Sequence, residues 1–289
     1  MPRTSLTVGD LEITALLDGV QELDGPITEF FPGVPAEALG SFRARAPGVY
    51  GEHGGWRLHV RAWLIRHADG LVLVDTGVGQ PGAPGPAWFG APGALPSSLR
   101  EADASLEAID TVVLTHVHDD HIGGTVTFTE GEPEPAFPRA TYLLQRADRI
   151  WQAELAREDE EDRVIDSTLL QPLERSGQLT LIEGHHVLAE GIELHLAPGH
   201  TPGHQIVRVR SRGSNAIITG DTFNHAIQLA HPEWPSGTDA DPAEATRTRI
   251  RVLAELAAQP ATTIAPAHFA EAFGEVQAGE DGVVSWGSR

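Results

Sequence analysis

Apolar and polar residues alternate along the chain in short runs, and this two-residue period predicts β-strands. Residues 6–17 alternate well enough for one or two strands, with a turn at Asp18-Gly19. Residues 56–67 and 71–74 flank Ala68-Asp69-Gly70, which predicts a β-hairpin. Similar runs predict further strands at residues 109–114, 140–144, 179–182, 192–196, 205–210, 216–219 and 262–265.

Apolar residues at helical spacing lie between these strands. In the segment 146–157, Ile150, Trp151 and Leu155 fall on one face of a helix. Asp241-Pro242 supplies an N-cap residue and a first-turn proline, which predicts a helix over residues 241–258.

Two further helices are predicted at residues 97–108 and 167–175, and the acidic run 158–162 is expected to be a solvated loop or a helix end. Strands followed by helix, repeated twice, indicate an α/β (α+β) fold with the four layers of an αββα sandwich.

Two segments rich in glycine and proline interrupt the pattern, at residues 21–56 and 77–96. A long irregular segment in a compact protein often forms the wall of a pocket, which is the role expected for residues 21–56. Its apolar side chains also offer a surface for a homodimer. No Pro/Ser-rich linker divides the chain, so a single domain over residues 1–289 is predicted.

The amino-acid composition limits the kinds of molecule that the protein is expected to bind. The formal net charge is −21, and every basic side chain is arginine. Such a surface disfavours nucleic acid, whose binding depends on basic contacts to phosphate, and it disfavours anionic membranes. Neither a signal peptide nor a membrane-spanning run is apparent, so a cytoplasmic location is expected. The absence of cysteine excludes disulfides and thiolate metal ligands.

The chemistry is concentrated in one heptad, Thr-His-Val-His-Asp-Asp-His at residues 115–121. Side chains at alternate positions of an extended strand end share one face, so His116, His118 and Asp120 can converge there. A turn after Asp120 would bring His121 toward a second point in the same cavity. One tetrahedral ion does not easily use all four groups from so short a segment, so two adjacent metals are predicted.

Further ligand candidates follow strand-like runs at turns marked by glycine or proline. His200 stands in Ala-Pro-Gly-His, Asp221 ends Ile-Ile-Thr-Gly-Asp, and His268 stands in Ala-Pro-Ala-His-Phe. Turns at strand ends are where a rigid scaffold usually displays chemistry.

These motifs, in this order and with Val74-Asp75-Thr76-Gly77 upstream, resemble the metallo-β-lactamase-fold hydrolase superfamily. The resemblance runs from about residue 11 to residue 269. It implies an αββα sandwich of two similar halves. Members of the superfamily hydrolyse lactams, lactones, thioesters, phosphoesters and nucleic acids, so the resemblance specifies the fold better than the substrate.

The resemblance implies a dinuclear centre. The first metal would be held by His116, His118 and His200, and the second by Asp120, His121 and His268. Asp221 would bridge the two ions opposite a bridging hydroxide, which would be the nucleophile. Asp120 and Asp221 are therefore the expected catalytic carboxylates, with Asp120 also taking the leaving group's proton. Two divalent ions are expected as cofactors; zinc suits imidazole best, and iron, manganese and cobalt also fit.

Other residues are expected around this centre. Asp75 matches the carboxylate that orients a ligand histidine in the superfamily, and His204 is expected to be a hydrogen-bonded residue behind the ligands rather than a ligand. Aromatic and polar side chains near the expected mouth are candidates for the substrate pocket: Phe31, Trp88, Phe89, Phe223, Asn224, His225, His231 and Trp234.

The stretch after Asp221 resembles the branch that contains methyl parathion hydrolase and related lactonases. This implies a hydrolase of lactone, carboxylic ester or phosphotriester bonds, acting on a small, neutral and partly apolar substrate. One departure stands out. Many acyl-homoserine lactonases carry a tyrosine shortly after the bridging aspartate, whereas this chain has Thr222-Phe223-Asn224. Asn224 or His225 would then have to supply the hydrogen bond.

Two other classes remain open. A thioesterase of the glyoxalase II type would take a substrate with a negatively charged handle, which calls for a basic pocket mouth. A non-hydrolytic diiron redox protein would need an acidic residue in place of a ligand histidine and a flavin domain. The sparse arginines and the intact histidines disfavour both.

Overall fold

The computed structural model describes residues 4–43, 46–52, 54–128, 132–259, 261–278 and 284–288. Within them, two seven-stranded sheets form the centre of the molecule. The first sheet contains, in spatial order, β1 (Ser5–Val8), β2 (Leu11–Glu22), β3 (Arg57–His67), β4 (Gly70–Val74), β5 (Thr111–Val113), β8 (Thr141–Gln145) and β9 (Leu179–Ile182). Its strands are antiparallel from β1 to β4 and parallel from β4 to β9.

The second sheet contains β10 (His186–Ala189), β11 (Ile192–Leu196), β12 (Gln205–Ser211), β13 (Ser214–Gly220), β14 (Thr263–Pro266), β15 (Gly274–Ala278) and β16 (Val284–Ser288). Only its β13–β14 pair is parallel among the described strands. A small separate hairpin joins β6 (Val126–Thr127) and β7 (Glu134–Pro135).

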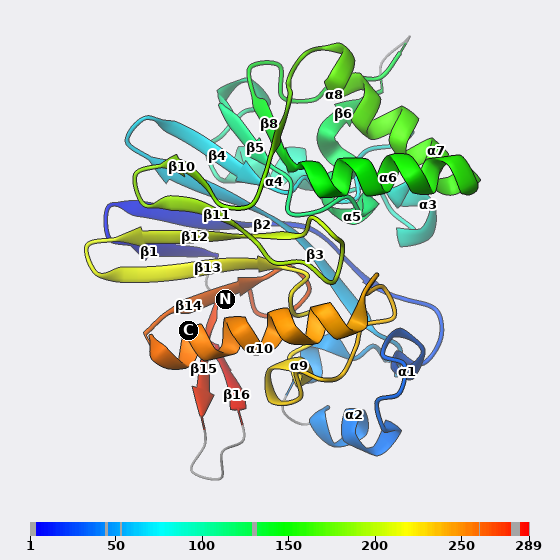
Figure 1. Ribbon diagram of the computed structural model, residues 1–289, viewed down its shortest axis with the longest axis vertical. Coiled ribbons are helices and arrows are strands. Elements are labelled where there is room, and N and C mark those ends of the chain that lie inside the picture. Colours follow the sequence, from blue (N-terminus) through cyan, green and yellow to red (C-terminus); the bar gives the residue numbers. More distant parts are fainter. Residues whose placement is uncertain are drawn as a thin grey trace.

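Helices cover both outer faces of the paired sheets (Figure 1). The first sheet is covered by α4 (Leu95–Glu101), α6 (Arg146–Glu158), α7 (Glu160–Ile165) and α8 (Gln171–Arg175), and a π-helical turn at Asp166–Leu170 joins the last two. The second sheet is covered by α9 (Ile227–Ala230) and α10 (Pro242–Ala258). The short helices α3 (Gly85–Phe89) and α5 (Asp119–Ile122) and the 3₁₀ turns Pro47–Val49, Leu106–Ala108 and Gly123–Thr125 lie in the connections.

Three buried clusters fill the spaces between the four layers. One cluster lies between the sheets and joins side chains such as Ile13 and Val72 to Val207 and Ile218. The other two lie outside each sheet, beneath the helices. The alternation within single strands follows from this arrangement: Ile218 faces the other sheet, whereas Ile217 faces the helical side. The expected four-layer αββα sandwich is confirmed.

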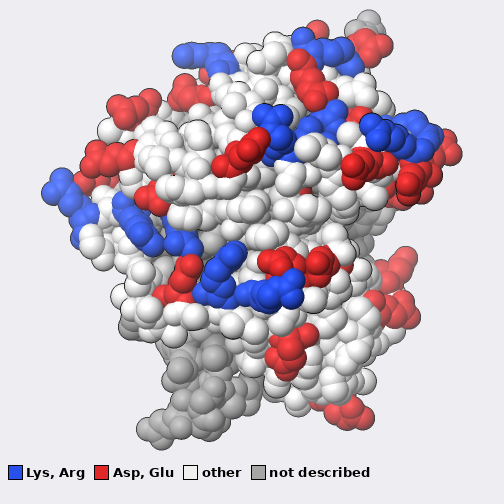
Figure 2. Space-filling model, in the orientation of Figure 1, with Lys and Arg blue, Asp and Glu red and all other residues white. Residues whose placement is uncertain are grey.

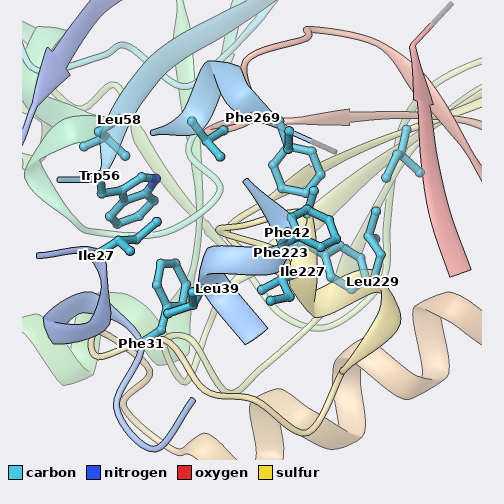
Figure 3. Packing of buried hydrophobic residues seen from close by; sticks show 14 of the residues in the cluster. Ile27, Phe31, Leu39, Phe42, Trp56, Leu58, Phe223, Ile227, Leu229 and Phe269 are labelled. Carbon is cyan, nitrogen blue, oxygen red and sulfur yellow. The ribbon is translucent and has the colours of Figure 1, made fainter. Parts of the chain in front are cut away.

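The segment before β3 packs within the chain. It forms α1 (Ile27–Phe30) and α2 (Ala36–Phe42), where no regular structure was predicted. Figure 3 shows Phe31, Leu39 and Phe42 beside Phe223 and Ile227, in one cluster that also includes α10. The apolar side chains expected to offer a dimer surface are therefore used inside the chain.

The turn predicted at Asp18-Gly19 is wrong. The chain turns at Gly9-Asp10, and β2 continues through Asp18 with a shift of register between Leu17 and Gly19. Asp18 is buried there because its carboxylate accepts hydrogen bonds from the backbone of Val78 and Leu95. Asp18, which was predicted to form a turn, is thus a buried residue that holds the segment after β4 by hydrogen bonds.

Other helices begin or end at residues that differ from the predicted ones, for local reasons. The helix predicted at 97–108 ends at Glu101, and Asp103 then adopts a positive φ of 52°. The acidic run 158–162, expected to be a solvated loop or a helix end, contains the end of α6 and the start of α7. Asp159 caps the first turn of α7 by accepting from the backbone of Glu161 and Asp162. None of the described helices has the length and apolar character needed to cross a membrane.

Candidate metal centre

Seven side chains from four separate chain segments meet at the ends of the strands. The heptad follows β5 and runs into α5; His200 follows β11, Asp221 follows β13 and His268 follows β14. The short α5 starts after His118, and its backbone bonds turn His121 back toward the strand end. The sequence thus folds so that residues more than 140 positions apart in the chain share one cavity floor.

The first group consists of His116, His118 and His200. His118 Nδ1 lies 3.1 Å from His116 Nε2 and 3.0 Å from His200 Nε2. Two nitrogen ligands of one tetrahedral zinc ion, each about 2.0–2.1 Å from it, are about 3.3 Å apart. The three nitrogens are therefore spaced as the corners of one coordination site.

The second group consists of Asp120, His121 and His268. The Nε2 atoms of the two histidines are 3.3 Å apart, and each lies 3.6 Å from Asp120 Oδ2. In each of the two groups, the candidate ligand atoms all lie within 4.8 Å of one another. This spacing again fits one ion.

Asp221 lies between the groups. Its Oδ1 is 3.2 Å from His121 Nε2, and its Oδ2 is 3.0 Å from His268 Nε2 and 3.3 Å from His200 Nε2. Among the described residues, the buried Oδ1 receives no hydrogen bond. A buried carboxylate oxygen without a donor, surrounded by imidazole nitrogens, is what a bridging metal ligand requires. The donor set therefore fits two divalent ions.

In the first group, the environments of His116 and His118 favour the neutral imidazole, which is the form that binds metal. Burial, together with the neighbouring imidazoles, lowers the pKa of His116 and His118 well below the ordinary value of 6.5. For His121, burial acts in the same direction, but the carboxylates of Asp221, Asp120 and Asp75 outweigh it and raise the pKa. These carboxylates attract positive charge to the centre, whether it is a proton or a metal ion.

Asp75 orients His121 as expected from the sequence. His121 Nδ1 donates to Asp75 Oδ2 at 2.8 Å, which leaves Nε2 facing the centre. Asp75 also accepts from the backbone and hydroxyl of Thr115, and it adopts a positive φ of 60°. Such a strained conformation in a non-glycine residue persists only where several contacts hold it.

His204 positions Asp221. The backbone N–H of Asp221 donates to His204 Nε2 at 2.9 Å, so His204 Nδ1 carries the proton and donates to the carbonyl of Ala197. Burial lowers the pKa of His204 to about 3, consistent with a neutral ring. Gly220 has a φ of 47°, and a Cβ there would lie 2.6 Å from His204 Nε2, so only glycine fits beside this ring.

Two carboxylates behind the centre were missed in the sequence. Asp239 Oδ1 lies 3.2 Å from His200 Nδ1, and its Oδ2 accepts from the buried Arg249. Asp148, in α6, accepts from the hydroxyl of Thr201 and the backbone of Gly203. No local motif marks either residue, because each meets the ligand loops only through the tertiary fold.

Asp148 contacts both loops that carry the first group of ligands. Its carboxylate accepts from the backbone of Val117 as well as from Thr201 and Gly203. Burial raises the pKa of Asp148 to about 6, although these hydrogen bonds and the nearby His200 oppose the shift.

A cavity of about 480 Å³ opens above the centre, and His118, Asp120, Asp221 and His268 form part of its lining. Most of the remaining wall is apolar and comes from Phe30, Trp56, Leu58, Trp88, Trp151 and Leu155. The expected role of residues 21–56 as a pocket wall applies to Leu23, Phe30 and Trp56. The wall also includes the acidic residues Asp119, Asp159, Glu161 and Asp162, and no arginine of the described residues lines it.

A sequence profile of the Metallo-beta-lactamase superfamily matches residues 55–268. The chain belongs to this superfamily. A curated relative, an N-acyl homoserine lactonase of Bacillus thuringiensis, is 24% identical over 208 residues, which cover 67% of this chain and 76% of the lactonase. The chain is therefore a superfamily hydrolase with lactonase relatives.

Solved structures support the same fold. The hydrolase AbOPH of the beta lactamase superfamily aligns with a TM-score of 0.83 at 22% identity, covering 99% of this chain and 96% of AbOPH. AidC, a dizinc quorum-quenching lactonase in complex with a homoserine product, aligns with a TM-score of 0.80 at 22% identity, with the same coverage. At these identities the likeness concerns the fold.

Only two of the residues predicted for the substrate pocket line this cavity. Trp88 and Asn224 line it. Four of the predicted residues lie elsewhere, because they are buried in the cores of the fold: Phe31, Phe89, Phe223 and His225. His225 is enclosed by the rings of Phe31, Phe42 and Tyr50, and burial lowers its pKa to about 3.

His231 also lies away from the cavity. It stacks on Trp234 with ring centroids 3.8 Å apart, in a shallow groove between α2 and α9. The sequence missed Trp151, which does line the cavity. Trp151 was read as the apolar face of a helix, and its proximity to His118 appears only in the folded chain.

Proposed function

We propose that this protein is a dinuclear metal-dependent hydrolase of lactone, carboxylic ester or phosphotriester bonds in small, neutral and partly apolar substrates. The observation that carries the proposal is the arrangement of Asp221 between two groups of metal-competent side chains on the floor of an apolar cavity. A centre this close to a substrate-sized cavity is suited to catalysis rather than to a structural metal.

His116, His118 and His200 would hold one ion, and Asp120, His121 and His268 the other, with Asp221 shared between them. Two divalent ions held there would supply a hydroxide nucleophile near neutral pH and would polarise the scissile bond. Zinc is the proposed metal because imidazole suits it, with iron, manganese and cobalt as alternatives.

The chain's own residues then perform three tasks. Asp75, His204 and Asp239 fix the orientation of ligand side chains, so that the centre needs little rearrangement during reaction. The aromatic wall holds the apolar part of the substrate and excludes water. Asp120 faces the cavity, and its carboxylate takes the proton destined for the leaving group.

The charge of the cavity favours the proposed substrate class over an acyl thioester with an anionic handle. Asp119, Glu161 and Asp162 line the wall, and among the residues that the structure describes no arginine lies there to balance their charge. An anionic substrate would be repelled at this mouth, whereas a neutral lactone or ester would not. A curated relative named as an N-acyl homoserine lactonase agrees with this choice. The tyrosine typical of many such enzymes is absent from the stretch Thr222-Phe223-Asn224, where Asn224 donates to Asp221 Oδ2 at 2.7 Å.

An activity panel tests the proposal. Purified protein is assayed with acyl-homoserine and simple lactones, aryl esters, paraoxon-like triesters and glutathione thioesters, and its metal content is measured alongside. We expect turnover of at least one lactone, ester or triester, and little turnover of the thioester. Activity on thioesters alone would contradict the proposed substrate class.

Asp221→Ala serves as the variant for this panel, and His231→Ala, outside the cavity, as its matched control. Hydrolysis should fall to background in the first and remain near the parent rate in the second. Full turnover by Asp221→Ala would contradict the dinuclear mechanism.

A further inference from the structure

Three metal-competent side chains also meet on the outside of the second sheet. Glu193 and His195 stand two residues apart on β11, and His185 lies in the link between β9 and β10. Their ligand atoms all lie within 4.8 Å of one another. Because β9 belongs to the first sheet and β10 to the second, His185 lies in the crossing between the two sheets.

The alternation of β11 directs this cluster outward. Ile192 and Leu194 are buried between the sheets, so Glu193 and His195 point to the opposite face. The side chains of His185, Glu193 and His195 are 51%, 34% and 26% exposed, which leaves the cluster open to an ion from solution.

The spacing within the cluster is that of a coordination site. His195 Nε2 lies 2.9 Å and His185 Nε2 lies 3.3 Å from the same oxygen, Glu193 Oε2. The ring centroids of the two histidines are 4.5 Å apart. Ligands of one tetrahedral zinc ion are about 3.3 Å apart, so small side-chain movements suffice for an ion to enter, with water as a fourth ligand.

We propose that His185, Glu193 and His195 form a third divalent-metal site, separate from the catalytic centre and selective for zinc-like ions. Two imidazoles and one carboxylate favour such ions over magnesium or calcium. The net charge of −21 favours cation binding in general. The nearest strand neighbour of opposite charge, Arg208, is already paired with Glu255 on α10. The proposal does not depend on the proposed hydrolase function.

An ion at this site would hold the link between β9 and β10, which connects the two sheets, against β11. Gly184, beside His185, exchanges two hydrogen bonds with the side chain of Gln145. Gln145 in turn donates to Gln205, which donates to the carbonyl of Leu114, between the end of β5 and His116. The third metal would therefore hold one end of a series of hydrogen bonds that runs from Gly184 through Gln145 and Gln205 to Leu114, close to His116.

Zinc stoichiometry tests the site. The parent protein and the variants His185→Ala, Glu193→Gln and His195→Ala are equilibrated with the same micromolar free Zn²⁺, and bound zinc per chain is measured by elemental analysis. Each variant should bind one equivalent less than the parent. The control His231→Ala removes the histidine from another exposed His–Glu pair and should bind as much as the parent.

Equal zinc content in the parent and His195→Ala would overturn the proposal, and so would the loss of more than one equivalent, which would place the effect at the other centre. Hydrogen exchange on the parent alone gives a second test. Amides of the link at residues 183–185 should exchange several-fold more slowly after zinc is added beyond the first two equivalents. Unchanged exchange there would also contradict the site.

Discussion

At the scale of single residues, Asp148 connects the two loops that carry the first group of candidate ligands. One buried carboxylate accepts from Val117, Thr201 and Gly203, and these residues adjoin His116, His118 and His200. Outer residues that hold metal ligands in place typically change metal affinity by 10–100-fold when they are replaced. Asp148 is therefore a positioning residue for the centre, although it does not face the cavity.

We expect Asp148→Asn to weaken metal retention by about tenfold or more, because the amide keeps the shape but loses one acceptor and the negative charge. Competition with a chromogenic chelator measures the affinity. Asp103→Asn, in an exposed turn after α4, is the matched control. An Asp148→Asn protein that folds and keeps the parent affinity would show that the loops hold their ligands without this carboxylate.

The sequence indicated the candidate ligands because each stands in a short motif at the end of a strand. The heptad, Gly220-Asp221 and Ala265-Pro-Ala-His268 are local patterns, and the structure brings all of them together. Asp148 and Asp239 have no such pattern. Their positions are set by contacts between distant segments, which periodicity along a single chain does not encode.

At the scale of elements, α6 and α7 line one side of the cavity, and the acidic residues Glu161 and Asp162 there belong to α7. Helical spacing predicted α6, but the start of α7 at Glu160 lies in a run of charges that was expected to be a solvated loop or a helix end. The capping carboxylate of Asp159 fixes that start, and the register of α7 places Glu161 and Asp162 at the cavity but not Glu160. Helix register, rather than charge content, decides which acidic groups meet the substrate.

Glu161→Lys should raise kcat/KM for an anionic ester relative to its neutral analogue, on the order of threefold at low salt, because repulsion at the mouth becomes attraction. Glu160→Lys is the matched control, since it makes the same change one residue away from the wall. The ratio of the two rates is measured at low and high ionic strength. If both variants shift the ratio equally, the effect arises from net charge and not from the wall.

At the scale of the whole molecule, the two stacked sheets bring ligand segments from both halves of the sequence to one place. The heptad comes from the first sheet, whereas His200, Asp221 and His268 come from the second. Figure 2 shows basic and acidic side chains side by side on one face of the molecule. This distribution agrees with a small-molecule substrate. A single domain over residues 1–289 remains a prediction.

The most direct test of the dinuclear centre is an anomalous-difference map from crystals, recorded at the absorption edge of the bound metal. Two peaks are expected on either side of Asp221, one among His116, His118 and His200 and the other among Asp120, His121 and His268. The positions of the peaks distinguish these two ions from an ion bound by His185, Glu193 and His195 at the surface. A single peak beside Asp221, or none, in active crystals would contradict the account.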